Sequence, residues 1–251
     1  MIRVEGLNKS YGNKKVVNNV SFNIEKNKIT SLIGPNGAGK STVLSMISRT
    51  IKKDSGKIFI DNKELSLWNE DDLSKKIGSL KQSNNIIMRL TIQELVEFGR
   101  FPHSKGYINN EDKIIVKEAL EYMELYEIKD KYIDELSGGQ LQRAYIAMVI
   151  AQDTEYILLD EPLNNLDMKH SVNMMKRLKN LAEEKDKTII IVLHDINFAS
   201  KYSDNIIIFK EGEVIINETK ENVIKKEILE DAYEIDFHIH NIDADKICVY
   251  F

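Results

Sequence analysis

The sequence predicts an α/β fold on the basis of three observations. Several short apolar runs are bounded by glycine, aspartate or charge, and two of them, YILLD at 156–160 and TIIIVLH at 188–194, do not alternate with polar residues. Such runs are typical of parallel strands whose two faces are both covered by helices. A glycine-rich loop, GPNGAGKST at 34–42, stands between an apolar run and a helical one. Between about 88 and 152 a helical pattern replaces the strand pattern.

In chain order, we expect strands at KITSLI before residue 34, GKIFI at 56–60, YILLD, TIIIVLH, and NIIIFK at 205–210. TIQELVEFGRF and EDKIIVKEALEYMELYEIKD place apolar residues at helical spacing, which indicates a helical subdomain inserted into the core. ENVIKKEILEDAY is amphipathic, and EIDFHIHNIDADKICVYF suggests a terminal strand or hairpin. We therefore predict one domain, 1–251, with an α/β core at 1–87 and 153–220, a helical subdomain at 88–152 and an extension at 221–251.

Composition narrows the function. The chain is 42% hydrophobic and 30% charged, with a formal net charge of -5, so it lacks the basic field of non-specific nucleic-acid binders and we expect no nucleic-acid partner. Its one cysteine, Cys248, cannot form an intramolecular disulfide, which suits a reducing compartment. We expect neither a signal peptide nor a membrane span, because the N-terminus has no apolar h-region and no apolar run reaches about 18 residues.

The loop at 34–42 fits the phosphate-loop pattern G-x-x-x-x-G-K-[ST] in the required strand-to-helix context. Gly34, Gly37 and Gly39 permit positive φ, so that backbone N–H groups can surround phosphate oxygens. Lys40 supplies a charge for the β- and γ-phosphates, and the Ser41 hydroxyl can bind Mg²⁺. A coincidental glycine-rich turn is the weaker interpretation.

The stretch YILLDEP ends an apolar run with two acids. Because side chains alternate along a strand, Asp160 and Glu161 point in different directions, so one can serve Mg²⁺ while the other addresses an attacking water. We predict Glu161 as the general base of a hydrolysis reaction. His194, at the end of the next apolar run, can contact the γ-phosphate or the water, because ligands of open α/β sheets bind at the carboxyl ends of strands.

Two further residues are weaker candidates. Gln82 closes another possible strand in GSLKQSNN and could sense Mg²⁺ or water. Tyr11 precedes a glycine ahead of the phosphate loop, and an adenine could stack on its ring. A turn tyrosine is about as good an explanation of Tyr11 taken alone.

A second glycine-rich helix start, LSGGQ, lies at 136–140. Ser137, Gly138 and Gly139 offer N–H groups, a hydroxyl and the positive end of a helix, but no second GK[ST] or acidic pair accompanies them. This is half of a phosphate site. A twofold dimer, in which each LSGGQ faces the phosphate loop of the other subunit with ATP between them, would complete it.

The order YG, GPNGAGKST, Q, LSGGQ, YILLDEP, NNLD, H resembles the nucleotide-binding subunits of ABC transporters along nearly the whole chain. The resemblance implies a P-loop NTPase (RecA-like) core with an antiparallel β portion and an inserted helical subdomain. It also implies a head-to-tail ATP-sandwich homodimer with ATP and Mg²⁺ as cofactors. In it Tyr11 stacks on adenine, Gln82 links the site to the membrane partner, Glu161 is the base and His194 senses the γ-phosphate.

The same resemblance extends the set of site residues. Asn164 to Asp167 would cross the dimer interface. Nucleotide contacts are expected from Gly34, Pro35, Asn36, Gly37, Ala38, Gly39, Lys40, Ser41, Thr42, Ser137, Gly138, Gly139, Gln140 and Asp167. Mg²⁺ ligands are expected from Ser41, Gln82 and Asp160.

The transported molecule follows from a narrower resemblance. LTIQELVEFGRFPHSKG is similar to ATPases that serve siderophore and vitamin B12 uptake, and DEPLNNLDMKH with VLHDINFASKYSD looks most like the siderophore branch, including petrobactin-type systems. His103 stands where that branch is expected to have an aromatic, and NNLD replaces a segment that often begins with a small residue. The resemblance implies separate permease subunits, an extracytoplasmic binding protein and a place at the cytoplasmic face of the membrane.

Several alternatives remain open. Vitamin B12 or heme could be the substrate, and a soluble ABC ATPase of DNA repair or translation usually has a long coiled coil or two cassettes, which this sequence lacks. A P-loop kinase would leave LSGGQ and Glu161 without a task. His238 and His240 lie two residues apart, close to Asp243, Asp245 and Cys248, so a metal site is imaginable. We favour an ordinary terminal strand.

Overall fold

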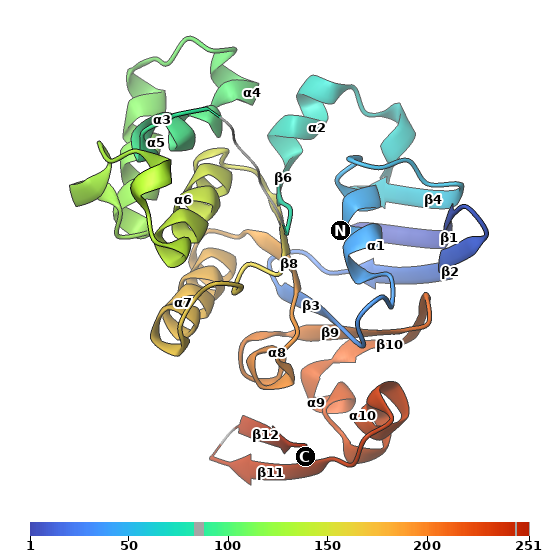
Figure 1. Ribbon diagram of the computed structural model, residues 1–251. Helices are drawn as coiled ribbons and strands as arrows, with labels where there is room; N and C mark the ends of the chain where they lie inside the picture. The colour runs from blue at the N-terminus through green and yellow to red at the C-terminus, as the bar shows by residue number, and fades with distance from the viewer. Residues whose placement is uncertain (83–87, 244, 251) are drawn as a thin grey trace. The chain divides into compact units, whose positions relative to one another are not determined.

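Two units make up the chain in a computed structural model that describes residues 1–82, 88–243 and 245–250 (Figure 1). Unit 1 consists of Met1–Trp68 and Lys179–Phe251, and unit 2 of Asn69–Leu178. Helix α7 (Met168–Glu184) begins in unit 2 and ends in unit 1. Among the described residues, no helix is both long enough and apolar enough to cross a membrane.

Unit 1 contains an antiparallel sheet and a mixed one. The antiparallel sheet has the order β2-β1-β4-β5, formed by β1 (Ile2–Tyr11), β2 (Lys14–Ile24), β4 (Ser55–Ile60) and β5 (Lys63–Glu64). The mixed sheet has the order β10-β9-β3-β8, formed by β3 (Ile29–Ile33), β8 (Thr188–Val192), β9 (Asn205–Lys210) and β10 (Glu213–Thr219). All residues of β3 and β8 are buried, which explains their continuous apolar sequences. The α/β fold with an antiparallel portion is therefore confirmed.

The helices of unit 1 are α1 (Lys40–Ile47), η1 (Leu65–Leu67), α8 (Ile196–Tyr202), α9 (Lys220–Val223) and α10 (Lys226–Tyr233). The chain ends in a two-stranded hairpin, β11 (His238–Ile242) and β12 (Asp245–Val249), which we call the C-terminal hairpin. The predicted amphipathic stretch and terminal hairpin are both present.

Unit 2 combines two parallel strands with helices. The strands are β6 (Ile77–Leu80) and β7 (Tyr156–Asp160). The helices are α2 (Glu70–Lys76), α3 (Ile92–Phe98), α4 (Phe101–Ser104), α5 (Asn110–Tyr122), η2 (Tyr126–Ile128), η3 (Ile133–Glu135) and α6 (Gly138–Ala151). Capping boxes begin α3 at Thr91 and α5 at Asn109, because each side chain accepts a hydrogen bond from the backbone of the acidic residue three positions later.

Helix α5 is shorter than its sequence pattern predicts. The apolar spacing continues to Tyr126, but the helix ends at Tyr122. Glu124 adopts a left-handed backbone with φ of 55°, and a short 3₁₀ turn follows. Met123 is nevertheless fully buried, so the apolar spacing marks core positions on both sides of the break and does not reveal where the helix stops.

The register of the parallel strands decides where loops meet. β3 and β8 run side by side with Leu32 opposite Val192, so both strands end at the same edge in unit 1. In unit 2, β6 and β7 pair with Leu80 opposite Leu159. The phosphate loop, Gln82, Glu161 and His194 follow these four strand ends, which is where α/β proteins bind their ligands.

Candidate functional site

The phosphate loop joins β3 to α1 in unit 1, and two of its glycines are sterically required. A Cβ on Gly34 would lie 2.0 Å from the carbonyl oxygen of Phe209, and one on Gly39 would lie 2.7 Å from that of Val16. Both also have positive φ, of 136° and 98°. The loop is therefore held against β9 and β2 by close backbone contacts that larger residues would prevent.

Lys40 begins helix α1 and turns its side chain back over the loop. Its Nζ donates to the carbonyl oxygens of Gly34 at 2.7 Å and Pro35 at 2.9 Å. The side chain is buried, so these contacts hold a positive charge inside the loop. A fixed ammonium among backbone N–H groups is suited to the phosphates of a nucleotide.

A pocket of about 480 Å³ opens beside this loop, within unit 1. The phosphate loop contributes Pro35, Asn36, Gly37 and Ala38, and a Cβ built on Gly37 would meet nothing within 4 Å. The remaining lining residues come from β2, the β9–β10 turn and α10: Lys14, Lys15, Val16, Lys210, Glu211, Gly212, Ala232, Tyr233 and Glu234. The volume suits a molecule of nucleotide size, and Lys14 and Lys15 supply positive charge, whereas Lys210 is paired with Glu234.

Tyr11 lies at the end of β1, with 52% of its surface exposed. It pairs across the β1–β2 turn with Lys14, which lines the pocket, although Tyr11 itself is not among the described lining residues. The Lys9 ammonium lies 5.4 Å from the centroid of its ring. The available ring face is compatible with stacking on a base at the margin of the pocket.

His194 follows β8 and is exposed. The Leu193 N–H donates to the carbonyl of Leu32 at 3.2 Å, so the two chain segments are tied at the point where β3 and β8 end. His194 and the phosphate loop therefore leave the same edge of the same sheet, as the sequence predicts.

In unit 2, Glu161 follows β7 and receives two side-chain hydrogen bonds. Gln82 Nε2 donates to Glu161 Oε2 at 2.6 Å, and Asn164 Nδ2 donates to the same oxygen at 2.7 Å. Glu161 has a left-handed backbone with φ of 51°, which turns the chain sharply after the buried Asp160. Two of the predicted site residues, Gln82 and Glu161, are thus in direct contact.

The LSGGQ segment forms the start of α6. Ser137 Oγ accepts from the N–H of Gln140 at 3.3 Å, and Gln140 Oε1 accepts from the N–H of Ser137 at 3.0 Å, which completes a capping box. Within unit 2 the two glycines have a further task. Cβ atoms on Gly138 and Gly139 would lie 3.3 Å from side-chain atoms of Asn165 and Leu166, respectively. The glycines let the NNLD segment approach the helix start closely.

Asp167 ends the NNLD segment and caps α7. Its Oδ1 accepts from the N–H of His170 at 2.8 Å and contacts His170 Nδ1 at 2.8 Å. The backbone and then the side-chain hydrogen bond of His170 hold the pKa of Asp167 below its usual value. Asp167 is therefore a well-ordered anion at an exposed position of unit 2.

The donor set expected for Mg²⁺ consists of oxygen atoms, which is the chemistry that this ion prefers. The Ser41 hydroxyl belongs to unit 1, and Gln82 and Asp160 belong to unit 2. At the other end of the chain, His238 and His240 lie on β11. No group of three or more His, Cys, Asp or Glu side chains arranged for a metal ion is found among the described residues.

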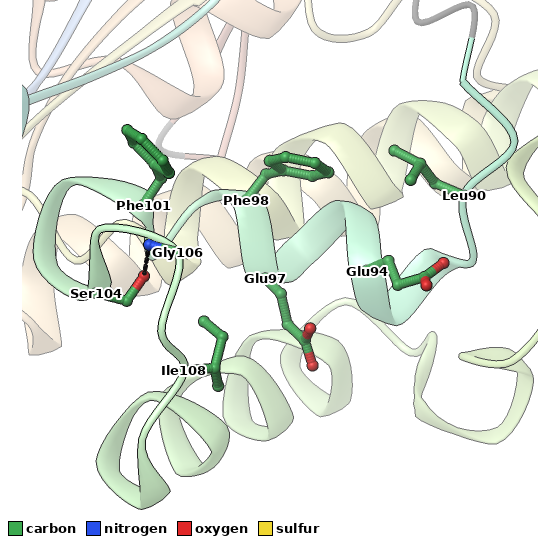
Figure 2. Close-up of a pocket in the computed structure, with 8 residues that line it drawn as sticks. All are labelled: Leu90, Glu94, Glu97, Phe98, Phe101, Ser104, Gly106 and Ile108. Carbon is green, nitrogen blue, oxygen red and sulfur yellow. Dashed lines mark hydrogen bonds between the residues drawn. The ribbon is translucent and has the colours of Figure 1, made fainter.

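An apolar groove of about 230 Å³ lies on α3 and α4 of unit 2 (Figure 2). We call it the α3–α4 groove; it is lined by Leu90, Glu94, Glu97, Phe98, Phe101, Ser104, Gly106 and Ile108. Phe98 and Phe101 are 48% and 55% exposed. Large exposed aromatic side chains at an open groove are typical of a protein interaction site.

Sequence reasoning missed several of these features. We expected Asn164 at a dimer interface and not as a hydrogen-bond partner of Glu161 within one chain. An amide three residues after an acid in a turn could have predicted this hydrogen bond. Lys14 and Lys15 gave no signal, because their position depends on β2 lying next to the phosphate loop. The α3–α4 groove arises from helix packing that the spacing of apolar residues does not specify.

A model of the ABC transporter family matches residues 17–164. The chain is 56% identical over 251 residues to the petrobactin import ATP-binding protein YclP of Bacillus subtilis (strain 168), covering 100% of both chains. It is 46% identical over 250 residues to the petrobactin import ATP-binding protein FatE of Bacillus anthracis, again covering 100% of both. The iron(3+)-hydroxamate import ATP-binding protein FhuC of Bacillus subtilis (strain 168) is 40% identical over 240 residues, which cover 95% of this chain and 89% of FhuC.

Solved structures show the same likeness. The dimeric structure of MJ0796, a bacterial ABC transporter cassette, matches with a TM-score of 0.80 and 36% identity, covering 88% of this chain and 99% of that one. The post-hydrolysis state of the same cassette, bound to ADP and Pi, matches with a TM-score of 0.79 and 35% identity over the same shares.

Proposed function

Because this chain belongs to the ABC transporter family, whose model matches residues 17–164, we propose that it is the ATP-binding and ATP-hydrolysing subunit of an importer for a ferric siderophore. The observation that carries this proposal is the full-length likeness to petrobactin import ATP-binding proteins. The chain also retains a complete set of nucleotide-site motifs, which a degenerate subunit would lack.

Nucleotide binding is assigned to unit 1. The phosphate loop surrounds the phosphates, Lys40 neutralises them from inside the loop, and Tyr11 stacks on the adenine. Lys14 and Lys15, at the rim of the pocket, attract the polyanion. Mg²⁺, when bound, would supply positive charge to the phosphates, and Ser41, Gln82 and Asp160 are the residues that would hold it.

Hydrolysis is assigned to Glu161 and His194. Glu161 accepts a proton from the attacking water, and the amides of Gln82 and Asn164 fix the direction in which its carboxylate points. His194 contacts the γ-phosphate from the end of β8 and stabilises the charge that develops on it. Phosphoryl transfer needs the activated water to attack in line with the γ-phosphate.

The second half of each site is assigned to another copy of the chain. Ser137, Gly138 and Gly139 offer a helix N-terminus without an associated lysine or acidic pair, so they serve a γ-phosphate bound by a partner. The related cassette MJ0796 forms a dimer in its solved structure. We infer a head-to-tail homodimer with two ATP molecules between the subunits, and a contribution of Asp167 across the interface.

The α3–α4 groove is the proposed binding site for the permease subunits, which places the chain at the cytoplasmic face of the membrane. The partner segment is a short amphipathic helix whose apolar side packs against the exposed Phe98 and Phe101, and it carries a basic residue that pairs with Glu94 or Glu97 of the same groove. In this assignment Gln82 links the site to the permease, and its hydrogen bond to Glu161 extends that link to the catalytic base.

The test is reconstitution of the chain with its permease subunits in proteoliposomes, together with the substrate-binding protein. We expect ferric petrobactin to stimulate ATP hydrolysis and to be taken up, with no effect of vitamin B12 or heme. Glu161→Gln in the same complex is the negative control. Stimulation by vitamin B12 or heme alone would reassign the substrate, and ATP hydrolysis that never responds to a permease would favour a soluble ABC ATPase.

A further inference from the structure

Helix α8 begins directly after His194, and one of its faces binds the last strand of the chain. Asn197, Ser200 and Lys201 stand at spacings that place them on one side of the helix. Ser200 Oγ donates to the carbonyl of Lys246 at 2.7 Å, and Lys201 forms an ion pair with Asp245. β12 thus has β11 along one edge and side chains of α8 along the other.

Asn197 makes the most specific of these contacts. Its Nδ2 donates to the carbonyl of Cys248 at 3.1 Å, and its Oδ1 accepts from the N–H of Cys248 at 2.8 Å. One amide side chain therefore satisfies both backbone groups of one strand residue, as a neighbouring strand would. Cys248 is buried, so the loss of Asn197 would leave these groups without their partner in a poorly hydrated place.

The C-terminal hairpin is anchored independently of α8. Phe237 is fully buried between Tyr233 and Tyr250, with ring centroids 5.9 Å and 5.3 Å away. Lys246 Nζ donates to the carbonyls of Glu221 at 2.9 Å and Ile224 at 2.8 Å, at the end of α9. The hairpin is consequently a fixed body to which α8 is attached.

The segment that carries His194 is held on both sides. Before it, the Leu193 N–H is bonded to the carbonyl of Leu32 in β3. After it, the Asp195 carboxylate accepts from the N–H of Asn197 at 2.7 Å and caps α8. Asn197 therefore bonds through its backbone to the residue next to His194 and through its side chain to the hairpin.

Asp195 also lies within electrostatic reach of the last strand. Burial raises the pKa of the Tyr250 hydroxyl, and the negative charge of Asp195 raises it further. The same carboxylate acts on Cys248, whose pKa burial raises to about 11. These effects agree with the hydrogen bonds in placing the start of α8 against β12.

We propose that the C-terminal hairpin is a clamp that positions His194 for ATP hydrolysis, with Asn197 as the positioning residue through which it acts. The proposal rests on the role of His194 in the proposed function. Within the described part of the chain, Asn197 forms its hydrogen bonds with Asp195 and Cys248, and neither residue lines the nucleotide pocket. We therefore expect the clamp to act on the chemical step and to leave nucleotide affinity unchanged.

A double-mutant cycle between Asn197 and His194 tests the clamp, with full-length chains and steady-state ATP hydrolysis. We expect Asn197→Leu to lower kcat by about tenfold with little change in KM, since small displacements of a catalytic group are costly. In a His194→Ala background, Asn197→Leu should lower kcat no further, because the residue that it positions is absent. Equal losses in both backgrounds would overturn the proposal.

Ser200→Ala is the matched control, because it removes a hydrogen bond between the same helix and the same strand, one turn farther from His194. If the hairpin only stabilises the fold, kcat should follow the melting temperature in both variants. The clamp requires a larger loss of kcat in Asn197→Leu at an equal melting temperature. A His194→Ala variant with unchanged kcat would refute the role of His194 and the clamp together, whereas an inactive His194→Ala with a normal Asn197→Leu would refute the clamp alone.

Discussion

Gln82 and Glu161 are joined by a hydrogen bond of 2.6 Å, in which the Gln82 amide donates to the Glu161 carboxylate. Asn164 donates to the same oxygen. Gln82 and Asn164, which are far apart in sequence, thus orient one carboxylate. Gln82 lies just after β6, the strand that pairs in parallel with β7. A proton acceptor that is fixed from two sides loses little entropy when it meets its water.

We predict that Glu161→Gln binds ATP but loses hydrolysis by at least about 100-fold, because an amide cannot accept the proton of the attacking water. The glutamine oxygen can still accept from Gln82 and Asn164, so the local geometry should persist. Single-turnover hydrolysis and nucleotide titration measure the two properties. We also expect a stable dimer in saturating Mg-ATP. A variant that binds ATP yet remains a monomer by light scattering would contradict the ATP-sandwich arrangement.

Replacing Asn164 separates orientation from chemistry. Asn164→Leu removes one of the two donors to Glu161 Oε2, so we predict a loss of about tenfold in kcat with KM for ATP nearly unchanged. Asn165→Ala is a suitable control, since it removes the amide of the adjacent residue and keeps the Cβ that lies next to Gly138. Equal kinetics for wild type and Asn164→Leu would show that Gln82 alone is sufficient to orient the base.

Variants of Tyr11 that remove or keep the aromatic ring test its proposed stacking on adenine. Tyr11→Ala should raise KM for ATP by about tenfold or more, because stacking between a base and an aromatic side chain contributes roughly 1–3 kcal/mol. Tyr11→Phe retains the ring and should behave like the wild type in this respect. GTP and ATP should lose affinity to a similar extent in Tyr11→Ala, since stacking is tolerant of base identity. An unchanged KM in Tyr11→Ala would indicate an ordinary turn tyrosine.

Much of the fold was predictable because its buried strands have recognisable apolar sequences. YILLD coincides with β7, and the predicted runs KITSLI, TIIIVLH and NIIIFK contain β3, β8 and β9, since residues buried on both faces have to be apolar. The site motifs were predictable for a related reason: a phosphate loop needs glycines at Gly34 and Gly39 for backbone contacts that no side chain permits. Local chemistry of this kind leaves a direct record in the sequence.

Other features cannot be predicted from such patterns. Helix α5 ends at Tyr122 because Glu124 has a left-handed backbone. Glutamate seldom adopts this conformation, so its presence in the sequence does not predict a helix end. The hydrogen bonds between Asn197 and Cys248 join two residue types that occur in many structural settings, so neither residue identifies the other as its partner. Spacing cannot identify such pairs, because they are created by the packing of α8 against a hairpin that follows it much later in the chain.

The buried pair of Arg100 and Asp112 should decide the stability of the helices of unit 2. Arg100 Nε donates to Asp112 Oδ1 at 2.8 Å, and Arg100 also donates to the carbonyl of Ala151 at 2.9 Å. Asp112→Leu would leave a buried guanidinium without its counter-ion and should cost about 3–5 kcal/mol of the free energy of unfolding. The double variant Arg100→Met, Asp112→Leu should recover most of this loss in urea unfolding. If the double variant recovers none of the lost free energy of unfolding, the pair stabilises the fold by more than mutual neutralisation of its charges.

The same pair predicts a pH dependence. Burial raises the pKa of Asp112, but the hydrogen bonds from Arg100 and the N–H of Asn109 outweigh burial, so the pKa lies below its usual value. A carboxyl with a lowered folded-state pKa stabilises the fold above its unfolded value of about 3.9, and this contribution is lost as the pH falls through the folded value. The difference in unfolding free energy between wild type and Asp112→Leu should therefore shrink below about pH 4. A constant difference from pH 7 to pH 3 would contradict this assignment.

Ser137 separates the two halves of the proposed site most directly. Ser137→Arg places a large charged side chain at the exposed start of α6, where the phosphate of a partner-bound nucleotide is expected. Nucleotide affinity of the isolated chain should stay unchanged, because Ser137 is not among the described residues that line the nucleotide pocket. Turnover should fall by at least about 100-fold, since the donors of the second half-site are blocked. Ser137→Ala is the control for the lost helix cap, which costs about 1 kcal/mol of stability. Full turnover in Ser137→Arg would mean that LSGGQ does not complete the site of a partner subunit, and that its glycines serve only the close packing of Asn165 and Leu166.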